Sequence, residues 1–572
     1  MRDVSYFTHP LSVPQRRYEA LRALFVDRMP GSMVAERFGF SSTYIRLLKH
    51  QFRQGKIDFF EPSVSGPKQR HKVSADVRRK IIEWRQKKLS SGQIAELLIE
   101  DGIDISIATV ARVLAEEGFK KLSRRTRLQI GFTVKGAQVP ERSERVTVTQ
   151  FEGKRFESDG AGVYLFAPFI AQFKLDELVR KAGLPQTKCV SVENYLLSFL
   201  ALKLLGNERY AHVGEHSFDP GLGLFTGLNV IPKCTALSTY SYSLDEAHIM
   251  RLQKAFVQRA VRMGLYDGSV INMDFHTVPH YGEESEMEKH WAGAKGKVLK
   301  GALTLFAQDA ETKLMLYTAA DIQREEADDQ VLQFISFWKK VHKGLPPTLI
   351  FDSKFTTYKK LSELNRQGIK FITLRRRGSK LLEEVKKLDP WERINIPNAK
   401  RKYPNPYVHQ SYVTLHHYDG EVRQVVVKGN GREEPSFLIS NDFDLPVELL
   451  VGNYARRWRV ENGIAEAVKF FHLNALSSPI LIKVHFDVVM TMFADTLYNR
   501  LCQHLRGFEE CDAAKIFRDF VKGRGTVEIN NGEITVTYPK RAHNPILRAI
   551  PWHRLPQELP WLDNARLLLR FH

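Results

Sequence analysis

Cysteine is scarce in this chain of 572 residues, which has only four: Cys189, Cys234, Cys502 and Cys511. No two of them form a C-x-x-C pair, so the sequence predicts neither a disulfide framework nor a zinc ribbon. The sequence also lacks a long apolar run, because stretches such as NYLLSFLALKLLG are too short to cross a bilayer. The N-terminal segment MRDVSYFTHPLSVPQRRYEA lacks the apolar core of a signal peptide. Together these absences predict a cytoplasmic protein with reduced thiols and no membrane span.

Acidic residues are also in deficit, with 65 Asp and Glu against 85 Lys and Arg. The resulting net charge of +20 and a pI near 9.6 predict a polyanionic partner, most commonly nucleic acid. A soluble protein that is merely basic is the alternative. The length exceeds what one ordinary core accommodates, so the sequence predicts three or more domains.

The first unit, residues 1–56, has the layout of a helix-turn-helix DNA-binding domain. GSMVAERFGF and SSTYIRLLKHQFR are two short helical patterns with Gly39 in the turn between them, and Gly31-Ser32 and Ser41-Ser42 are candidate N-terminal caps. The second helix is predicted to present polar and basic side chains to a major groove, namely Thr43, Tyr44, Arg46, Lys49 and His50. A small bundle with a solvated basic face explains the same pattern.

A linker at residues 57–73, rich in Gly, Pro and Ser, leads to a second unit of three helical patterns at residues 74–122. Ser90 and Gln93 form a capping-box pair, and Ser106 can cap the third helix. That helix is predicted to contact DNA through Ser106, Thr109 and Arg112. The stretch KKLSRRTR runs into a basic linker, residues 123–158, where Arg124 and Arg125 are candidate phosphate contacts. An inert solvated linker is the competing interpretation.

Two aspartates follow apolar strand patterns in the centre of the chain. Residues 159–262 are predicted to be mainly helical, and residues 263–505 to form an α/β domain with a mixed sheet. GSVINMDFHTVPHYG places Asp274 near the end of a buried strand, and PTLIFDSKF ends a second strand at Asp352. Ligands in such domains gather at strand ends, although an aspartate there can also be a helix cap or turn residue.

A third acid, Glu461, is predicted to lie in one helix that spans LPVELLVGNYARRWRVENGIAEAVKFFHL. Offsets of three and seven residues put Tyr454, Arg457 and Glu461 on one face of that helix, where they could clamp a DNA phosphate or base. Salt-bridge decoration of a surface helix is the alternative. Trp458 is expected to pack in the core.

These residues resemble bacterial insertion-sequence transposases of the DDE class, which have an RNase H-like catalytic fold. The paired helical units resemble the tandem helix-turn-helix heads of many bacterial transposases. The closest branch carries the signature Tyr-x2-Arg-x3-Glu-x6-Lys, and Tyr454, Arg457 and Glu461 keep that spacing. Lys469 departs from it, because 469−461 = 8 where the signature asks for seven, and the extra residue turns the side chain by about 100° on an ideal helix.

The same branch has a β-rich insertion between its second aspartate and its glutamate. Here 109 residues separate Asp352 from Glu461, against 78 between Asp274 and Asp352, since 461−352 = 109 and 352−274 = 78. The longer gap contains strand patterns and a DG hairpin, so an insertion is predicted at about residues 390–443.

The resemblance implies that Asp274, Asp352 and Glu461 bind two Mg²⁺ ions, with Mn²⁺ as a substitute, and catalyse DNA end cleavage and strand transfer. It implies that Tyr454, Arg457 and Lys469 contact DNA. The implied partners are double-stranded DNA, both the terminal inverted repeats of the element and its target, and further copies of the chain in a homodimer or higher oligomer. The location implied is the bacterial cytoplasm, on the nucleoid when the protein is bound to DNA. A non-catalytic sequence-specific DNA-binding protein, either a regulator or an inactive transposase derivative, remains the alternative.

Several other residues have weaker settings. His276 could orient a carboxylate or water, or serve structure only. Six basic residues could line a DNA channel or form a solvated edge: Lys295, Lys297, Lys300, Arg375, Arg376 and Arg377. The C-terminal tail, residues 506–572, contains a predicted hairpin centred on Asn531-Gly532, and its task is either a subunit contact or a local cap.

Overall fold

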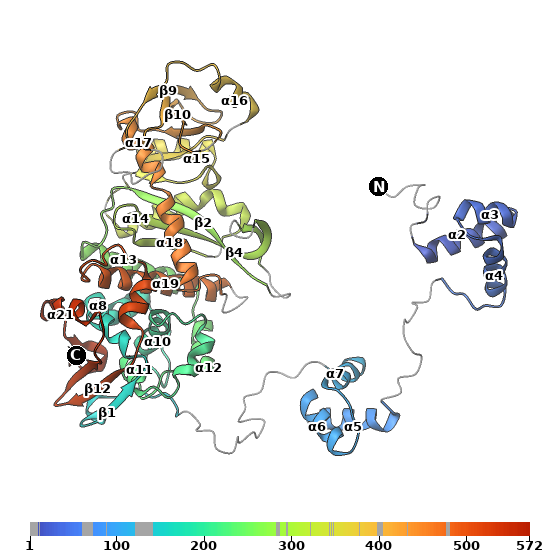
Figure 1. The fold of residues 1–572 in the computed structure, drawn as a ribbon, viewed down its shortest axis with the longest axis horizontal. Helices are drawn as coiled ribbons and strands as arrows, with labels where there is room; N and C mark the ends of the chain where they lie inside the picture. The colour runs from blue at the N-terminus through green and yellow to red at the C-terminus, as the bar shows by residue number, and fades with distance from the viewer. Residues whose placement is uncertain are drawn as a thin grey trace. The chain divides into compact units, whose positions relative to one another are not determined.

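The computed structural model describes most of the chain and divides it into two compact units, residues 1–137 and 138–572 (Figure 1). The described residues are 10, 12–59, 73–86, 89–119, 141–281, 287–292, 296–320, 322–342, 344, 346, 348–376, 378–396, 404–431, 433–475 and 481–572. The N-terminal unit is helical where it is described, and the C-terminal unit combines helices with a mixed sheet.

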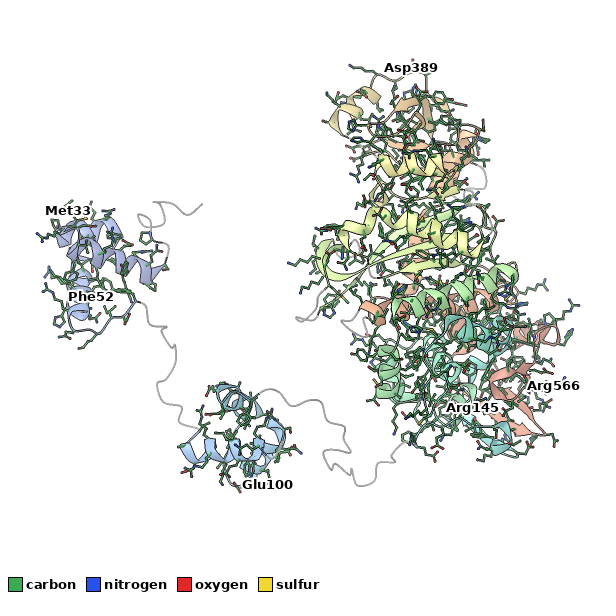
Figure 2. The ribbon with its side chains drawn as sticks, turned by 180° about the vertical axis from the view of Figure 1, so that it is seen from behind. Met33, Phe52, Glu100, Arg145, Asp389 and Arg566 are labelled. Atoms are coloured by element: carbon green, nitrogen blue, oxygen red, sulfur yellow. The ribbon has the colours of Figure 1, made fainter. Side chains whose placement is uncertain are left out.

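Two groups of three helices make up the described part of the N-terminal unit. They are α2 (Val13–Phe25), α3 (Gly31–Phe38) and α4 (Ser42–Arg53), then α5 (Ala75–Gln86), α6 (Ser91–Glu100) and α7 (Ile107–Glu116). Each group has its own apolar core, which includes Val34 and Phe38 in the first and Ile81 and Leu98 in the second. Figure 2 shows the side chains of both groups, with Met33 and Phe52 labelled on the first and Glu100 on the second.

Local capping chemistry begins three of these helices as the sequence predicts. The hydroxyl of Ser41 accepts a hydrogen bond from the backbone N–H of Tyr44, and Gly39 takes a left-handed φ of 68° in the turn before it. Ser90 and Gln93 form the expected capping box, and Ser106 caps α7. The predicted cap at Gly31-Ser32 is wrong, because Pro30 is the N-cap of α3 and makes no side-chain hydrogen bond there.

The C-terminal unit begins with a mainly helical region. Its elements are η2 (Val148–Phe151), β1 (Arg155–Ser158), η3 (Ala161–Phe166), α8 (Ala167–Phe173), α9 (Leu175–Ala182), α10 (Val192–Leu204), η4 (Tyr210–His216), α11 (Pro220–Phe225), α12 (Cys234–Tyr242) and α13 (Glu246–Arg262). Helix α10 is buried along nearly its whole length and packs on α19 (Leu481–Cys502). None of the helices described is long and apolar enough to span a bilayer.

The described strands of the central sheet follow the order β3-β4-β2-β6-β7-β11-β10-β9-β8, and β5 pairs with β4 beside this path. Their bounds are β2 (Ile271–Pro279), β3 (Lys289–Ala292), β4 (Lys297–Asp309), β5 (Met315–Ala319), β6 (Thr348–Ile350), β7 (Lys370–Leu374), β8 (Glu392–Arg393), β9 (Tyr407–Thr414), β10 (Glu421–Lys428) and β11 (Ser436–Ser440). Strands β2, β6 and β7 are parallel neighbours, and the other pairings are antiparallel. This mixture matches the α/β pattern that the sequence predicts.

The strands predicted as an insertion continue the central sheet. Strand β11 pairs with β7 through Leu438↔Leu374, and β10, β9 and β8 extend the sheet from there. The predicted segment of about residues 390–443 therefore shares hydrogen bonds with the strands around the acids. Part of it, residues 397–403, lies outside the described residues.

Helices and short turns connect and cover these strands. They are η6 (Arg324–Asp329), α14 (Gln330–Val341), η7 (Ser353–Phe355), α15 (Tyr358–Arg366), α16 (Ser379–Val385), α17 (Val447–Ala455), α18 (Trp458–Lys469), α20 (Ala513–Ile516) and the π-helical turn η8 (Phe517–Val521). Helix α18 lies over β2 and β4, which brings the segment after the insertion back to the centre of the sheet (Figure 1).

A second sheet joins the two ends of the C-terminal unit, in the order β1-β12-β13-β15-β14. Its C-terminal elements are β12 (Gly525–Asn530), β13 (Glu533–Tyr538), α21 (Asn544–Ala549), η9 (Trp552–Arg554), β14 (Glu558–Leu559), η10 (Pro560–Leu562) and β15 (Ala565–Phe571). The predicted hairpin is present, and Asn531 and Gly532 both have positive φ, as a type I′ turn requires. Strand β1 falls inside the predicted linker of residues 123–158, and it pairs with β12. Packing as a local cap is thus what the tail does within one chain.

Candidate active site

Asp274 lies in the middle of β2, opposite Phe306 of β4. The sequence pattern places it near a strand end, and this is wrong for the strand as a whole, because β2 continues to Pro279. The reason is the long antiparallel pairing with β4, which extends β2 beyond the point where its parallel pairing with β6 stops at Asn272↔Ile350. Asp274 therefore lies beyond the end of the pairing between β2 and β6, but within the pairing between β2 and β4.

Asp352 lies two residues after the end of β6, close to the strand end as predicted, and its carboxylate accepts a hydrogen bond from the backbone N–H of Ser353. The register shows that the two aspartates occupy equivalent places. Since Asn272 pairs with Ile350, and 274−272 = 2 while 352−350 = 2, each aspartate lies two residues beyond the last parallel pair. Neighbouring strands are about 4.8 Å apart, so both carboxylates leave the sheet at the same point.

Glu461 reaches this point from α18, but the helix predicted around it is not continuous. Helix α17 ends at Ala455 and α18 begins at Trp458, so Tyr454 and Glu461 lie on different helices. The backbone N–H of Arg457 bonds to the carbonyl of Tyr454, which is the tighter turn of a 3₁₀ helix. The carbonyl of Arg456 accepts hydrogen bonds from the backbone N–H of Arg459 at 2.9 Å and from the side chain of Asn272 at 3.4 Å, and a polar side chain at such a point is a common cause of helix breaks.

Arg457 sits between two of the acids. Its Nη2 donates to a carboxylate oxygen of Glu461, and its Nη1 lies 3.4 Å from Oδ2 of Asp274. The contact with Asp274 is one of charge alone, because Nη1 is buried and makes no hydrogen bond of good geometry within the described part of the chain. The ring of Tyr454 lies 5.9 Å from the same guanidinium. Three of the predicted site residues, Asp274, Arg457 and Glu461, thus meet.

The electrostatics show that Asp352 belongs to the same group. Burial raises the pKa of Asp274 to about 6, Arg457 opposes that shift, and both Glu461 and Asp352 add to it. Burial alone would lower the pKa of Arg457, yet its carboxylate neighbours raise it above its usual value. Glu461 and Asp352 are therefore close enough to disfavour the ionised form of Asp274, and the guanidinium of Arg457 partly offsets that effect.

Divalent metal ions are the ligands that this donor set suits, since Mg²⁺ prefers carboxylate oxygens. In the arrangement described, no three side chains of His, Cys, Asp or Glu are grouped so that they could bind a metal ion. At the acids, the guanidinium of Arg457 lies between Asp274 and Glu461, where a cation would be attracted. The chemistry of the donors fits a metal pair, and bringing the carboxylates together requires Arg457 to move aside.

Lys469 is not brought to the acids. It is 72% exposed and lies 3.9 Å from Asp512, next to Glu466 at the end of α18. The irregular spacing noted in the sequence therefore corresponds to a side chain that points elsewhere.

Other central residues that the sequence singled out have structural partners. His276 contacts Asn474 at 2.7 Å, and burial lowers its pKa. Arg375 donates to Gln424, while Arg376 donates to the carbonyl of Ser353 at 3.4 Å, next to Asp352. Lys297 is exposed on β4, and Lys300 is half-buried. Lys295 and Arg377 lie outside the described residues.

The N-terminal candidates lie on the predicted helices. On α4, Thr43, Arg46 and His50 are exposed, whereas Tyr44 and Lys49 are half-buried against neighbouring aromatic rings. On the second group, Arg112 is exposed, and the hydroxyls of Ser106 and Thr109 bond to each other at the start of α7. Arg124 and Arg125 lie outside the described residues.

A pocket of about 740 Å³ behind α18 was not predicted from the sequence. Glu466 of α18 and Asp495 of α19 both line it. The sequence does not mark Asp495 as a functional residue, because it lies in a mainly apolar stretch. Trp458 also lines this pocket and is 52% exposed, so its expected place in the core is wrong. Glu466, five residues after Glu461, was the only feature of the sequence that could have indicated the pair of acids formed by Glu466 and Asp495.

Comparison with known proteins identifies the kind of domain that carries the acids. Residues 265–496 match the family model described as "Transposase DDE domain". No curated protein matches the chain. A crystal structure of a pre-cleavage Mos1 transpososome is similar at 9% identity and a TM-score of 0.16, over 63% of this chain and 77% of that chain. A TM-score this low establishes no shared fold, so the family match is the informative comparison.

Proposed function

The chain carries a DDE-class transposase domain over residues 265–496, and from this premise we propose that it binds the terminal inverted repeats of an insertion sequence and catalyses two-metal DNA end cleavage and strand transfer. The catalytic domain is assigned an RNase H-like fold. The two helical groups of the N-terminal unit are assigned as helix-turn-helix domains that recognise the DNA ends, through α4 and α7. The net charge of +20 favours the same partner.

The observation that carries the proposal is the meeting of three acids from distant parts of the sequence. Asp274 and Asp352 are in matching register on parallel strands, and α18 brings Glu461 to them. In the proposed reaction these three carboxylates bind two Mg²⁺ or Mn²⁺ ions, which activate the attacking oxygen and stabilise the leaving one. Binding of a surface alone would not require a buried aspartate whose pKa is raised by burial and, to a smaller extent, by two neighbouring carboxylates.

Arg457 has a proposed part in substrate binding. When the carboxylates bind cations, its guanidinium loses both of its present partners and becomes available to a DNA phosphate, which it can contact with two parallel hydrogen bonds. Tyr454 flanks it and is assigned to the same DNA contact. Lys469 is proposed only as an outlying contact, since it pairs with Asp512.

The test is cleavage of a labelled duplex that contains one end of the DNA flanking the coding sequence. The expected result is nicking at that end with Mg²⁺ or Mn²⁺, no nicking in EDTA, and joined products when target DNA is added. Asp352→Ala should abolish nicking while DNA binding persists. Full nicking by Asp352→Ala would refute the assignment of the acids, and binding without nicking in either metal would favour a non-catalytic DNA-binding protein.

A further inference from the structure

Strands β3 and β4 form a two-stranded arm at the edge of the central sheet. The arm pairs Lys289 with Lys300 and Trp291 with Val298. Residues directly opposite each other in an antiparallel pair point to the same face, and so do residues two apart along a strand. All four side chains therefore share one face of the arm, with an apolar pair next to a pair of lysines.

The same register relates this face to the acids. Asp274 pairs with Phe306 of β4, and Phe306, Lys300 and Val298 are separated by even numbers of residues on that strand. The arm's face is thus continuous with the face of the sheet that carries Asp274. The hydroxyl of Thr277 donates to the carbonyl of Trp291 at 3.1 Å, which ties the arm to β2 three residues from Asp274. Phe306 and Lys300 are six residues apart on β4, since 306−300 = 6, and six strand residues span about 20 Å, which is the rise of about six base pairs.

Exposure of the apolar side chains on this face to solvent costs free energy. Trp291 is 56% exposed and Val298 is 52% exposed, so a large apolar pair faces solvent. Lys289 and Lys300 lie directly opposite each other and bring two positive charges to this face. Phosphates between two ammonium groups would be attracted by both. An aromatic ring with lysines beside it is also the composition that favours contact with nucleic-acid sugars and bases.

The backbone edge of β3 is less suited to pairing with a strand of a second protein. The carbonyl of Lys289 accepts a hydrogen bond from Nη2 of Arg324 at 2.7 Å, and that of Trp291 accepts the bond from Thr277. Occupied acceptors on an edge strand oppose the addition of another strand. The side-chain face, rather than the edge, is the surface that remains for a partner.

We propose that the arm of β3 and β4 binds duplex DNA about six base pairs from the cleaved bond, with Lys289 and Lys300 on phosphates and Trp291 against the sugars and base edges between them. This inference rests on the proposed function for its substrate, and it adds a contact surface that lies outside the three acids and the helix-turn-helix units. It assigns Lys300 a role in DNA binding and makes Trp291 the apolar part of the same contact.

The test measures affinity for a fluorescein-labelled duplex carrying the terminal repeat, at salt concentrations from roughly 50 to 200 mM. Loss of two phosphate contacts should reduce the slope of log affinity against log salt by about 1.8 in the variant Lys289→Gln/Lys300→Gln. Trp291→Ala should weaken binding by roughly tenfold and leave that slope unchanged, since it removes an apolar contact and no charge. Hydroxyl-radical protection should be lost in both variants about six base pairs from the cleaved bond.

The matched control is Lys181→Gln/Lys188→Gln, which removes the same charge from the helical region and should keep the wild-type slope. Thermal unfolding of each variant checks that the arm still folds, and Trp291→Phe should retain most of the affinity because it keeps an apolar ring at that position. An unchanged slope in the arm variant overturns the proposal, and so does a change of oligomeric mass in Trp291→Ala with full DNA affinity. Cleavage by the wild-type protein is measured in parallel, so failure of the proposed function would be seen separately.

Discussion

Carboxyl groups gather on both faces of α18, but their neighbouring charges differ. On one face Glu461 meets Asp274 and Asp352, and Arg457 lies among them. On the other face Glu466 faces Asp495 across the pocket behind the helix, where Lys313 is paired with Glu510 and Arg456 with Glu311. Each face has a carboxyl group whose pKa is raised by burial, Asp274 on the first and Asp495 on the second, but among the described residues only Asp274 has a guanidinium between it and its acidic neighbour.

The consequence of this difference is visible in the pKa values. Asp274 rises only to about 6 despite its burial, because Arg457 stabilises its ionised form. Burial raises the pKa of Asp495 well above its ordinary value, and the nearby Glu466 raises it further. A carboxylate beside a fixed cation stays ionised near neutral pH, whereas a buried carboxyl without one keeps its proton. Arg457 lies where a metal ion would replace it at the first group, whereas the raised pKa of Asp495 favours its protonated form at the second.

The largest expected contrast between the two faces is in catalysis. Glu461→Gln should lower the rate of DNA nicking by about a thousandfold or more, because a metal ligand contributes several kcal/mol to the transition state. Glu466→Gln should change it little, since the amide oxygen can still accept the hydrogen bond from Ala513. Single-turnover nicking of an end-labelled duplex measures both. Equal losses in the two variants would show that the faces are not functionally distinct.

The next contrast between the two faces is in how the free energy of unfolding depends on pH in the absence of metal ions. Because the pKa of Asp274 is raised from 3.8 to about 6, the folded protein binds a proton more tightly than the unfolded chain, and the free energy of unfolding falls as pH rises from about 4 to 6. Asp274→Asn should remove that fall and stabilise the protein by up to about 3 kcal/mol at pH 7, with no gain at pH 3.

Asp495→Asn provides the comparison with the other face of α18, because burial raises the pKa of Asp495 well above its ordinary value. Its stabilising effect should keep growing above pH 6, where that of Asp274→Asn is already level. Urea unfolding followed by circular dichroism in EDTA, across pH 3 to 8, gives both curves. Identical curves for the two variants would mean that Arg457 does not separate the faces electrostatically.

The smallest expected effect is that of the Arg457 guanidinium on metal binding. Removing the charge of Arg457 with Arg457→Gln should tighten Mn²⁺ binding in the absence of DNA by about tenfold, because the metal no longer competes with a guanidinium near Asp274 and Glu461. Electron paramagnetic resonance titration of free Mn²⁺ reports this directly. Arg456→Gln is the matched control, because Arg456 pairs with Glu311. Weaker Mn²⁺ binding in Arg457→Gln would mean that Arg457 supports the metal site instead of competing for it.

Features set by neighbours in sequence were predictable here. The serine caps at Ser41 and Ser106 and the Asn531-Gly532 hairpin depend on interactions within a few residues, so composition reveals them. The placement of Asp352 after a buried strand is equally local. Asp274 was harder, because the length of β2 depends on β4, a partner strand that begins eighteen residues after β2 ends, since 297−279 = 18.

Contacts between distant segments were decided only in three dimensions. Asn272 meets the chain at Arg456 and marks the break between α17 and α18, which a helical periodicity cannot reveal. Strand β1 pairs with β12 although the sequence between them exceeds a whole domain, so residues 155–158 resemble a linker when taken alone.

By itself, the sequence determined the nature of the acids, their order and the local setting of Asp352, because residue type and strand periodicity depend on short stretches of sequence. The tertiary structure decided that Asp274 and Asp352 share a register, that Arg457 joins Asp274 to Glu461, and that Lys469 turns to Asp512. It also decided which carboxyl groups keep their protons. The physical reason is that pKa and ion pairing depend on burial and on charges a few ångströms away, which come from segments far apart in the chain.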